Sequence, residues 1–148
     1  MLLVPDEVTW LDVIVPAGAP GWSNDVHGPM VWLGEHLVDA FDVTTRDGEF
    51  DVHRGAMQST PWSSTVCFDG LGAGEVLLDG RKLVGISQRR TRHAARLQCC
   101  WYSTYDPERL TSLLASSHRP PPDALRDVAT VADSVADALP DVLATLLG

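Results

Sequence analysis

Runs of β-branched, aromatic and alternating apolar residues predict strands in four parts of the chain. Residues 7–16 (EVTWLDVIVP) are rich in β-branched side chains, which predicts a strand buried on both faces. An Asp-Gly pair between apolar runs predicts a β-hairpin over residues 75–89, and residues 94–102 predict a further strand that pairs with it. A turn followed by a short strand is predicted within residues 46–55. The first two thirds of the chain are therefore predicted to form a sheet.

Apolar positions three and four residues apart predict helices in the same chain. The first helix is expected to begin with Asn24 as its N-cap and to run to about Phe41. Residues 106–108 (Asp-Pro-Glu) are typical of a helix start with proline at the first helical position. Three prolines at 120–122 interrupt the helical region, and an Ala-rich amphipathic helix is predicted from about residue 123 to residue 147.

This order of elements predicts the fold class and the domain organisation. Strands with one early helix, followed by helices at the end, are typical of an α/β or α+β domain. A chain of 148 residues has the usual size of a single domain with a continuous core. We expect a core over residues 1–115, and a Pro-rich break with a helical tail over residues 116–148 that packs on the same domain.

Composition narrows the classes of protein that the chain can belong to. No apolar run approaches the roughly 20 residues of a membrane span, and residues 1–7 lack the basic start and long apolar core of a secretory signal, so a cytoplasmic protein is expected. The three cysteines do not suggest a disulfide framework, and neither they nor the five scattered histidines have the spacing of a zinc site. A structural metal is not expected. The formal net charge of −9 argues against a general nucleic-acid binder.

Positive charge is concentrated in one segment of this acidic chain. Six of the eleven cationic side chains lie between residues 81 and 96, a window without Asp or Glu. Such a segment predicts a local site for a phosphate, a carboxylate or an acidic partner. A solvated strand edge that carries arginines is the alternative interpretation.

Lys82 is the only lysine of the chain and lies inside the basic segment. In an extended strand its side chain shares a face with Val84, Ile86 and Gln88, beside Gly85, where a ligand can approach the backbone closely. An ammonium group is a compact point charge, suited to holding a carboxylate or an acyl phosphate. The alternative is a turn lysine with its amine in water.

The stretch VCFDGLGAGEVLLDGRKLVGISQRRTRHAARLQC, residues 66–99, resembles the core motif of the lipoate-protein ligase and octanoyltransferase family, relatives of biotin-protein ligase. The resemblance covers roughly residues 2–114 and is most specific over GRK…GISQR. It implies a mixed β-sheet flanked by helices. It also implies that a lipoyl or octanoyl group is attached to a lysine of a lipoyl carrier domain, either an E2 subunit or a glycine-cleavage H protein.

The same resemblance assigns roles to individual residues. Lys82 matches the lysine that contacts the acyl carboxylate, so Lys82→Ala is expected to abolish acylation of the carrier domain and to leave the fold intact. Four residues on or next to that strand are expected to line the acyl pocket, namely Arg81, Gly85, Ser87 and Gln88. Ligases of the family use ATP and Mg²⁺ to form an acyl-adenylate from lipoate or octanoate, and the GRK…GISQ strand favours this route narrowly.

Cys67 bears on a second route through the same family. Octanoyltransferases of the cysteine type form a thioester on a cysteine in a V-C-F-[DE] stretch, which residues 66–69 resemble. A cysteine near a lysine has its thiolate favoured, which is the condition for nucleophilic attack. A buried, inert cysteine is the alternative for Cys67, and Cys99 and Cys100 are expected to fill core positions of a strand.

Three positions depart from the family pattern. Gly74-Glu75 stands where ligases have Asn-Asp, Cys99-Cys100 replaces His-Gly, and the R-R-x-x-G-G-G segment expected before the first strand is not found. The last difference suggests a start placed within a longer frame, a missing part on a separate chain, or an inactive copy. A non-catalytic module that binds an acyl group or a partner is therefore a further alternative to an enzyme.

Overall fold

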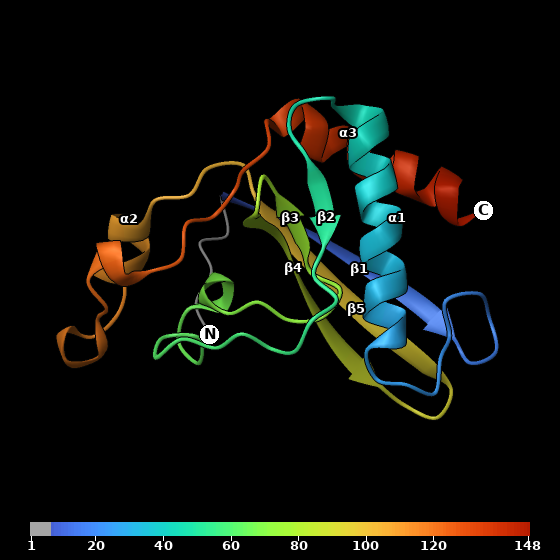
Figure 1. Cartoon of the computed structure of the whole chain (residues 1–148), viewed down its shortest axis with the longest axis horizontal. Helices are drawn as coiled ribbons and strands as arrows, with labels where there is room; N and C mark the ends of the chain where they lie inside the picture. Colours follow the sequence, from blue (N-terminus) through green and yellow to red (C-terminus); the bar gives the residue numbers. More distant parts are fainter. Residues whose placement is uncertain (1–6) are drawn as a thin grey trace.

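Five antiparallel strands form the centre of the computed structural model, which describes residues 7–148 (Figure 1). The strands are β1 Val8–Pro16, β2 Phe50–Val52, β3 Val76–Leu78, β4 Arg81–Arg90 and β5 Ala94–Tyr102, in the spatial order β1-β5-β4-β3-β2. The helices are α1 Gly28–Thr44, α2 Pro107–Ser112 and α3 Asp133–Leu147, with short 3-10 turns η2 Cys67–Asp69, η3 Ser116–His118 and η4 Pro122–Ala124. The predicted α+β class is confirmed. The predictions made for residues 1–6 lie outside the described residues.

The prediction of a mixed sheet is wrong for the five named strands, because all ladders between them are antiparallel. Among residues 7–148, parallel pairing is confined to two isolated bridges, Lys82–Val128 and Tyr102–Thr130. The segment around these two partners donates backbone hydrogen bonds to both strands, from Ala129 to the Lys82 carbonyl and from Val131 to the Tyr102 carbonyl. The helix predicted from about residue 123 therefore begins only at Asp133, since the residues before it add to the sheet.

The hairpin and the last strand have the predicted positions. Asp79 and Gly80 both have positive φ, 50° and 75°, as the tight turn between β3 and β4 requires. β5 pairs with β4 on one side and with β1 on the other, so it is an interior strand, and its last four residues are buried on both faces. The start of α2 is also confirmed, because the Asp106 side chain accepts hydrogen bonds from the backbone amides of Glu108 and Arg109.

β1 is an edge strand, and the prediction that it is buried on both faces is wrong. Its residues pair only with β5. Val15 is buried, whereas Trp10 and Ile14 on the opposite face are 49% and 57% exposed. The apolar composition of residues 7–16 therefore reflects one buried face and one apolar exposed face.

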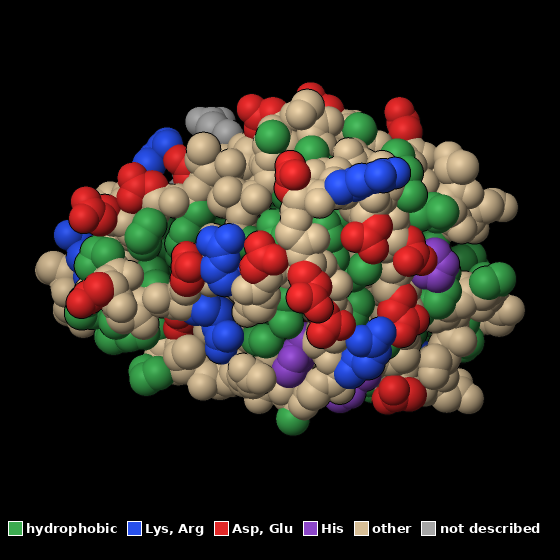
Figure 2. Space-filling view, turned by 45° about the horizontal axis from the view of Figure 1, so that its top comes forward, with side chains coloured by type: hydrophobic (Ala, Val, Ile, Leu, Met, Phe, Trp, Pro, Cys, Tyr) green, Lys and Arg blue, Asp and Glu red, His purple; other side chains and the backbone are tan. Residues whose placement is uncertain are grey.

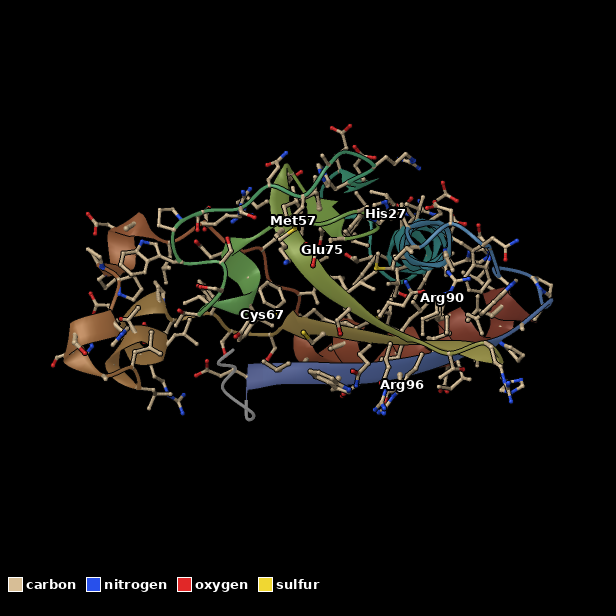
Figure 3. All side chains as sticks on the ribbon, turned by 90° about the horizontal axis from the view of Figure 1, so that it is seen from below. His27, Met57, Cys67, Glu75, Arg90 and Arg96 are labelled. Carbon is tan, nitrogen blue, oxygen red and sulfur yellow. The ribbon has the colours of Figure 1, made fainter. Side chains whose placement is uncertain are left out.

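One face of the sheet is covered by α1 and α3, which pack against each other (Figures 1 and 3). Buried residues of α1 recur at helical spacing toward this core (Leu33, Leu37, Ala40 and Phe41) and meet Ala136, Leu139 and Leu143 of α3. The predicted N-cap of α1 is wrong. The helix begins after His27, which makes no side-chain capping bond, and Pro29 occupies its first turn.

The loop of residues 53–74, which contains η2, covers part of the other face of the sheet, whereas Trp10 and Ile14 on that face are exposed. In Figure 3, η2 of this loop and α1 lie on opposite sides of β4. A second, smaller core forms here from Phe68, Cys100, Tyr102 and Val128. The Phe68 and Tyr102 rings meet edge to face, with centroids 4.9 Å apart. The sheet therefore separates a helix side from a loop side.

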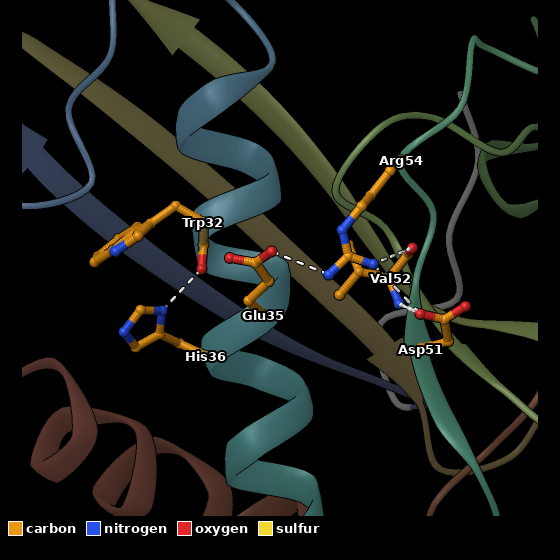
Figure 4. A network of polar contacts seen from close by, with 6 residues as sticks. All are labelled: Trp32, Glu35, His36, Asp51, Val52 and Arg54. Carbon is orange, nitrogen blue, oxygen red and sulfur yellow. Dashed lines mark hydrogen bonds and ion pairs between the residues drawn. The ribbon is translucent and has the colours of Figure 1, made fainter.

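Polar contacts at the surface connect α1 to the β2 edge. Arg54 bonds Glu35 of α1 at 3.0 Å, the Val52 carbonyl at 3.2 Å and Asp51 at 3.5 Å (Figure 4). Glu35 and Arg54 are about half exposed, so this ion pair adds little to stability. Asp and Glu side chains are spread over the face seen in Figure 2, with arginines between them, as the net charge of −9 leads one to expect.

Candidate functional site

A β-bulge in β4 sets the direction of the Lys82 side chain. Leu77 pairs with Lys82 and Val76 pairs with Val84, so Leu83 is an extra residue on β4. A methyl group built on Gly85 would lie 3.6 Å from the Lys82 Cε and 3.4 Å from the Phe68 ring. Lys82 therefore lies on the loop side with Gly85. The predicted alternation, which grouped Lys82 with Val84 and Ile86, is wrong because the bulge shifts it by one residue.

The Lys82 ammonium is buried and fully bonded. The side chain is 2% exposed, and its Nζ lies 2.8 Å from the Glu75 Oε2, 2.8 Å from the Gly70 carbonyl and 3.3 Å from the Cys67 carbonyl. The same nitrogen lies 4.9 Å from the centre of the Phe68 ring. A buried ammonium requires such partners, because an unpaired charge in the interior costs several kcal/mol. The alternative of a turn lysine with its amine in water is wrong.

Glu75 completes this pair and is held by the backbone around it. Its Oε2 also accepts a hydrogen bond from the Gly72 amide at 2.7 Å, and its Oε1 accepts one from the Ile86 amide at 3.2 Å. α1 packs directly on this loop, since a side-chain carbon at Gly34 would lie 2.2 Å from the Gly74 carbonyl oxygen. The two glycines therefore allow the close approach that fixes Glu75 over β4.

Cys67 opens η2, which is anchored at its other end by Asp69. The buried Asp69 carboxylate accepts hydrogen bonds from the Thr60 hydroxyl and, at 2.7 Å, from the Arg126 amide. Phe68 packs in the small core, and the Cys67 carbonyl is held by Lys82. The bonds of Asp69, the packing of Phe68 and the bond to the Cys67 carbonyl together hold Cys67 in place.

A cavity of about 180 Å³ lies between the loop side of the sheet and the 53–74 loop. Met57, Cys67 and Glu75, labelled in Figure 3, come from neighbouring segments around β4. The residues that line the cavity are Trp10, Met57, Ser63, Cys67, Gly70, Glu75, Lys82, Gly85, Ile86, Ser87, Gln98 and Cys100. A second cavity of about 330 Å³ shares Met57, Glu75, Ile86 and Ser87 with the first. The two cavities therefore adjoin along β4.

The surroundings of Cys67 favour its ionised form. The adjacent Cys100 thiol lowers the pKa of Cys67 to about 7, and the Lys82 charge acts in the same direction against the opposing effects of burial and of the Glu75 charge. The bond to Cys67 and burial raise the pKa of Cys100, so the pair ionises first at Cys67. Cys99, on the helix side, is inert by comparison, because burial raises its pKa to about 12. Cys67 is therefore the cysteine with the properties of a nucleophile.

The structure brings together four of the six residues singled out from the sequence. Cys67, Lys82, Gly85 and Ser87 line one cavity. Arg81 does not, because its exposed guanidinium faces Asp127 at 3.6 Å. Gln88 lines the adjoining cavity instead, where its Nε2 donates to the Val26 carbonyl at 2.7 Å.

Most of the cationic side chains of the basic segment already have partners within the chain. Lys82 and Arg81 face carboxylates, and Arg96 bonds Asp12 at 2.5 Å. Arg90 lies 4.3 Å from the centre of the Trp22 ring and donates to backbone carbonyls of the loop before α1. Within residues 7–148, the exposed Arg89 and Arg92 make no ion pair. A predicted attraction for anions therefore rests mainly on these two.

Three functional neighbours were missed from the sequence. In the sequence Glu75 stands out only as a departure from a motif, although the Asp-Gly turn brings it near Lys82 across the hairpin and a buried lysine needs a carboxylate. Cys100 was assigned to the core, and strand alternation alone gives opposite faces to Cys99 and Cys100. Met57 carried no local signal, because a long loop brings it to the cavity.

The arrangement joins an ionisable thiol, a buried cation and an apolar cavity, which together can support covalent acyl transfer. In the part of the chain that the structure describes, no three His, Cys, Asp or Glu side chains gather as a metal site would require. No helix among residues 7–148 combines the length and the hydrophobicity needed to cross a bilayer.

The sequence of the chain is similar to that of one known protein. The chain is 32% identical over 127 residues to the octanoyltransferase LipM of Kyrpidia tusciae. The match includes 82% of this chain and 43% of LipM, so the chain spans less than half the length of this relative. No family model matches the chain. The similarity supports the resemblance to the lipoate-protein ligase and octanoyltransferase family.

Proposed function

We propose that the chain is a member of the lipoate-protein ligase and octanoyltransferase family and transfers an octanoyl or lipoyl group through a thioester on Cys67. The observation that carries this proposal is the Cys67 thiol, with its pKa lowered to about 7, in an apolar cavity beside the Lys82 ammonium. A thiol with such a pKa is about half ionised at neutral pH. The V-C-F-D stretch and the similarity to LipM support the same assignment.

The proposed reaction has two acyl transfers. The Cys67 thiolate attacks the carbonyl carbon of an octanoyl thioester, the donor thiol leaves with a proton from solvent, and Cys67 holds the acyl group. The ε-amine of a lysine on a lipoyl carrier domain, of an E2 subunit or an H protein, then attacks this thioester. An amide forms, the amine proton is lost to solvent, and the Cys67 thiolate is released.

Lys82 has two tasks in this proposal. Its charge favours the thiolate over the thiol, and its bonds to the Cys67 and Gly70 carbonyls fix η2. Gly85 leaves room over β4 for the acyl chain, which would extend past Ser87 and Met57 into the adjoining cavity. The exposed Trp10 and Met57 lie at the cavity and offer an apolar contact for the carrier.

The ligase route remains a second prediction, based on the GRK…GISQ strand. It requires ATP, Mg²⁺ and free lipoate or octanoate, and it does not require Cys67. A non-catalytic module would use neither route.

One assay separates these proposals. The purified chain is mixed with a lipoyl domain and either an octanoylated carrier, or octanoate with ATP and Mg²⁺, and acylation of the acceptor lysine is followed by mass spectrometry. We expect product from the thioester donor without ATP, and its loss in Cys67→Ala but not in Cys99→Ala. Product that requires ATP and survives in Cys67→Ala would establish the ligase route instead. No product from either donor would reject both enzymatic proposals for this chain.

A further inference from the structure

Cys100 is a buried thiol that the proposed transfer does not use. It lies on β5 directly opposite Gly85 of β4, and it is 4% exposed. The missing side chain of Gly85 leaves space over this part of the sheet, where both Cys100 and Lys82 line the cavity. The family motif has glycine at the position of Cys100, so this thiol is not part of the resemblance.

The surroundings of Cys100 favour a proton donor over a second nucleophile. The small core of Phe68, Tyr102 and Val128 packs around it, with Cys67 at the edge of the same cluster. A thiolate surrounded by these aromatic and aliphatic groups would be poorly solvated. The proton of Cys100 therefore stays on its sulfur, and Cys67 lies beside it in the same cluster and at the same cavity.

We propose that Cys100 is a positioning residue for Cys67: its thiol donates a hydrogen bond to the Cys67 thiolate and holds this sulfur, ionised, at the cavity. The inference builds on the proposed function, in which Cys67 is the nucleophile. Cys100 forms no bond to the acyl group and keeps its proton throughout. Lys82 and Cys100 then stabilise the same negative charge, the first by its field and the second by a direct bond.

The two neighbouring cysteines of β5 give a matched test. Cys67 alkylation by iodoacetamide is measured against pH in the wild-type chain and in Cys100→Ala, Cys100→Ser and Cys99→Ala, with the modified peptide identified by mass spectrometry. In the wild type the rate is expected to be half-maximal near pH 7 and to fall tenfold per pH unit below it, because only the thiolate reacts.

Loss of the donor in Cys100→Ala is expected to move the midpoint upward by about one unit or more, which lowers the rate below the midpoint by about tenfold. Cys100→Ser retains an O–H donor and is expected to restore most of the shift, and Cys99→Ala is expected to leave the midpoint unchanged. An unchanged midpoint in a folded Cys100→Ala chain would overturn the proposal. If Cys100→Ala does not fold, Cys100→Val fills the space without a donor and is read in the same way.

This test distinguishes the inference from the proposed function, because alkylation needs no acyl donor and no carrier. A shifted midpoint with no acyl transfer would support the Cys100 role and reject the transferase. Acyl transfer with an unshifted midpoint would support the transferase and reject the Cys100 role.

Discussion

Cys99 and Cys100 are neighbours on β5, yet they belong to two different parts of the molecule. Cys99 faces the helix side, where α1 and α3 supply aliphatic and aromatic contacts and its sulfur is fully buried. Cys100 faces the loop side, where Lys82, Glu75 and Cys67 place charges and an ionisable thiol next to a cavity. The helix side maintains the fold through apolar packing. The loop side includes buried polar groups, which stabilise a structure only when all their partners are present.

The largest effect is expected from breaking the ion pair on the loop side. Lys82→Met leaves Glu75 buried without a cation, and it removes a donor from the Cys67 and Gly70 carbonyls. We expect the free energy of unfolding, measured with urea, to fall by about 3–5 kcal/mol. Lys82→Ala is expected to destabilise the fold in the same way, which corrects the prediction made from the sequence.

The matched control for this variant is Lys82→Met combined with Glu75→Gln, which removes both charges. It is expected to recover a large part of the lost free energy. A loss of less than about 1 kcal/mol in Lys82→Met would show that the pair behaves as an exposed one.

A substitution on the helix side is expected to lower the free energy of unfolding without changing the ionisation of Cys67. Leu37 of α1 is fully buried in the main core, and Leu37→Ala is expected to cost about 2–5 kcal/mol in the same unfolding experiment. The pH midpoint of Cys67 alkylation should remain near 7, because Leu37 is not among the residues that line the cavity. A shift of that midpoint would contradict the division into two sides.

The elements that sequence reasoning identified are those with a local signal. The Asp-Gly turn defined the hairpin, and Asp106 before proline defined the start of α2. Asn24 gave a false signal, since α1 begins after His27. The tail helix was predicted too long, because backbone pairing of residues 128–131 with the sheet has no signature in residue type.

The candidate site was only partly predictable for a related reason. Motif similarity identified Cys67 and Lys82, but strand alternation could not reveal the bulge at Leu83 that turns Lys82 to the loop side. Pairing of Glu75 with Lys82 and contact of Cys67 with Cys100 depend on how the 53–74 loop folds over β4 and β5. Such contacts between distant segments follow from packing and not from local pattern.

A smaller effect, on association with a carrier domain, is expected from replacing the two arginines that lack an ion pair. Arg89 and Arg92 make no ion pair within the described residues and lie at the end of the β4–β5 hairpin. If they attract an acidic carrier domain, their joint replacement by Ser should weaken association a few-fold at low salt and have little effect at high salt. The matched control is Arg90→Ala, because Arg90 is held against Trp22. Association that does not depend on salt would identify these arginines as ordinary surface charge.

The central claim is that Cys67 carries the acyl group. Its most direct test is to incubate the wild-type chain with an octanoylated carrier in the absence of ATP, quench with acid, and locate the added mass on tryptic peptides. We predict one octanoyl adduct on Cys67 that hydroxylamine removes, and no adduct on Cys99 or in the Cys67→Ala chain. A chain that stays unmodified while it acylates a lipoyl domain, or one that carries the adduct on another residue, would contradict the account.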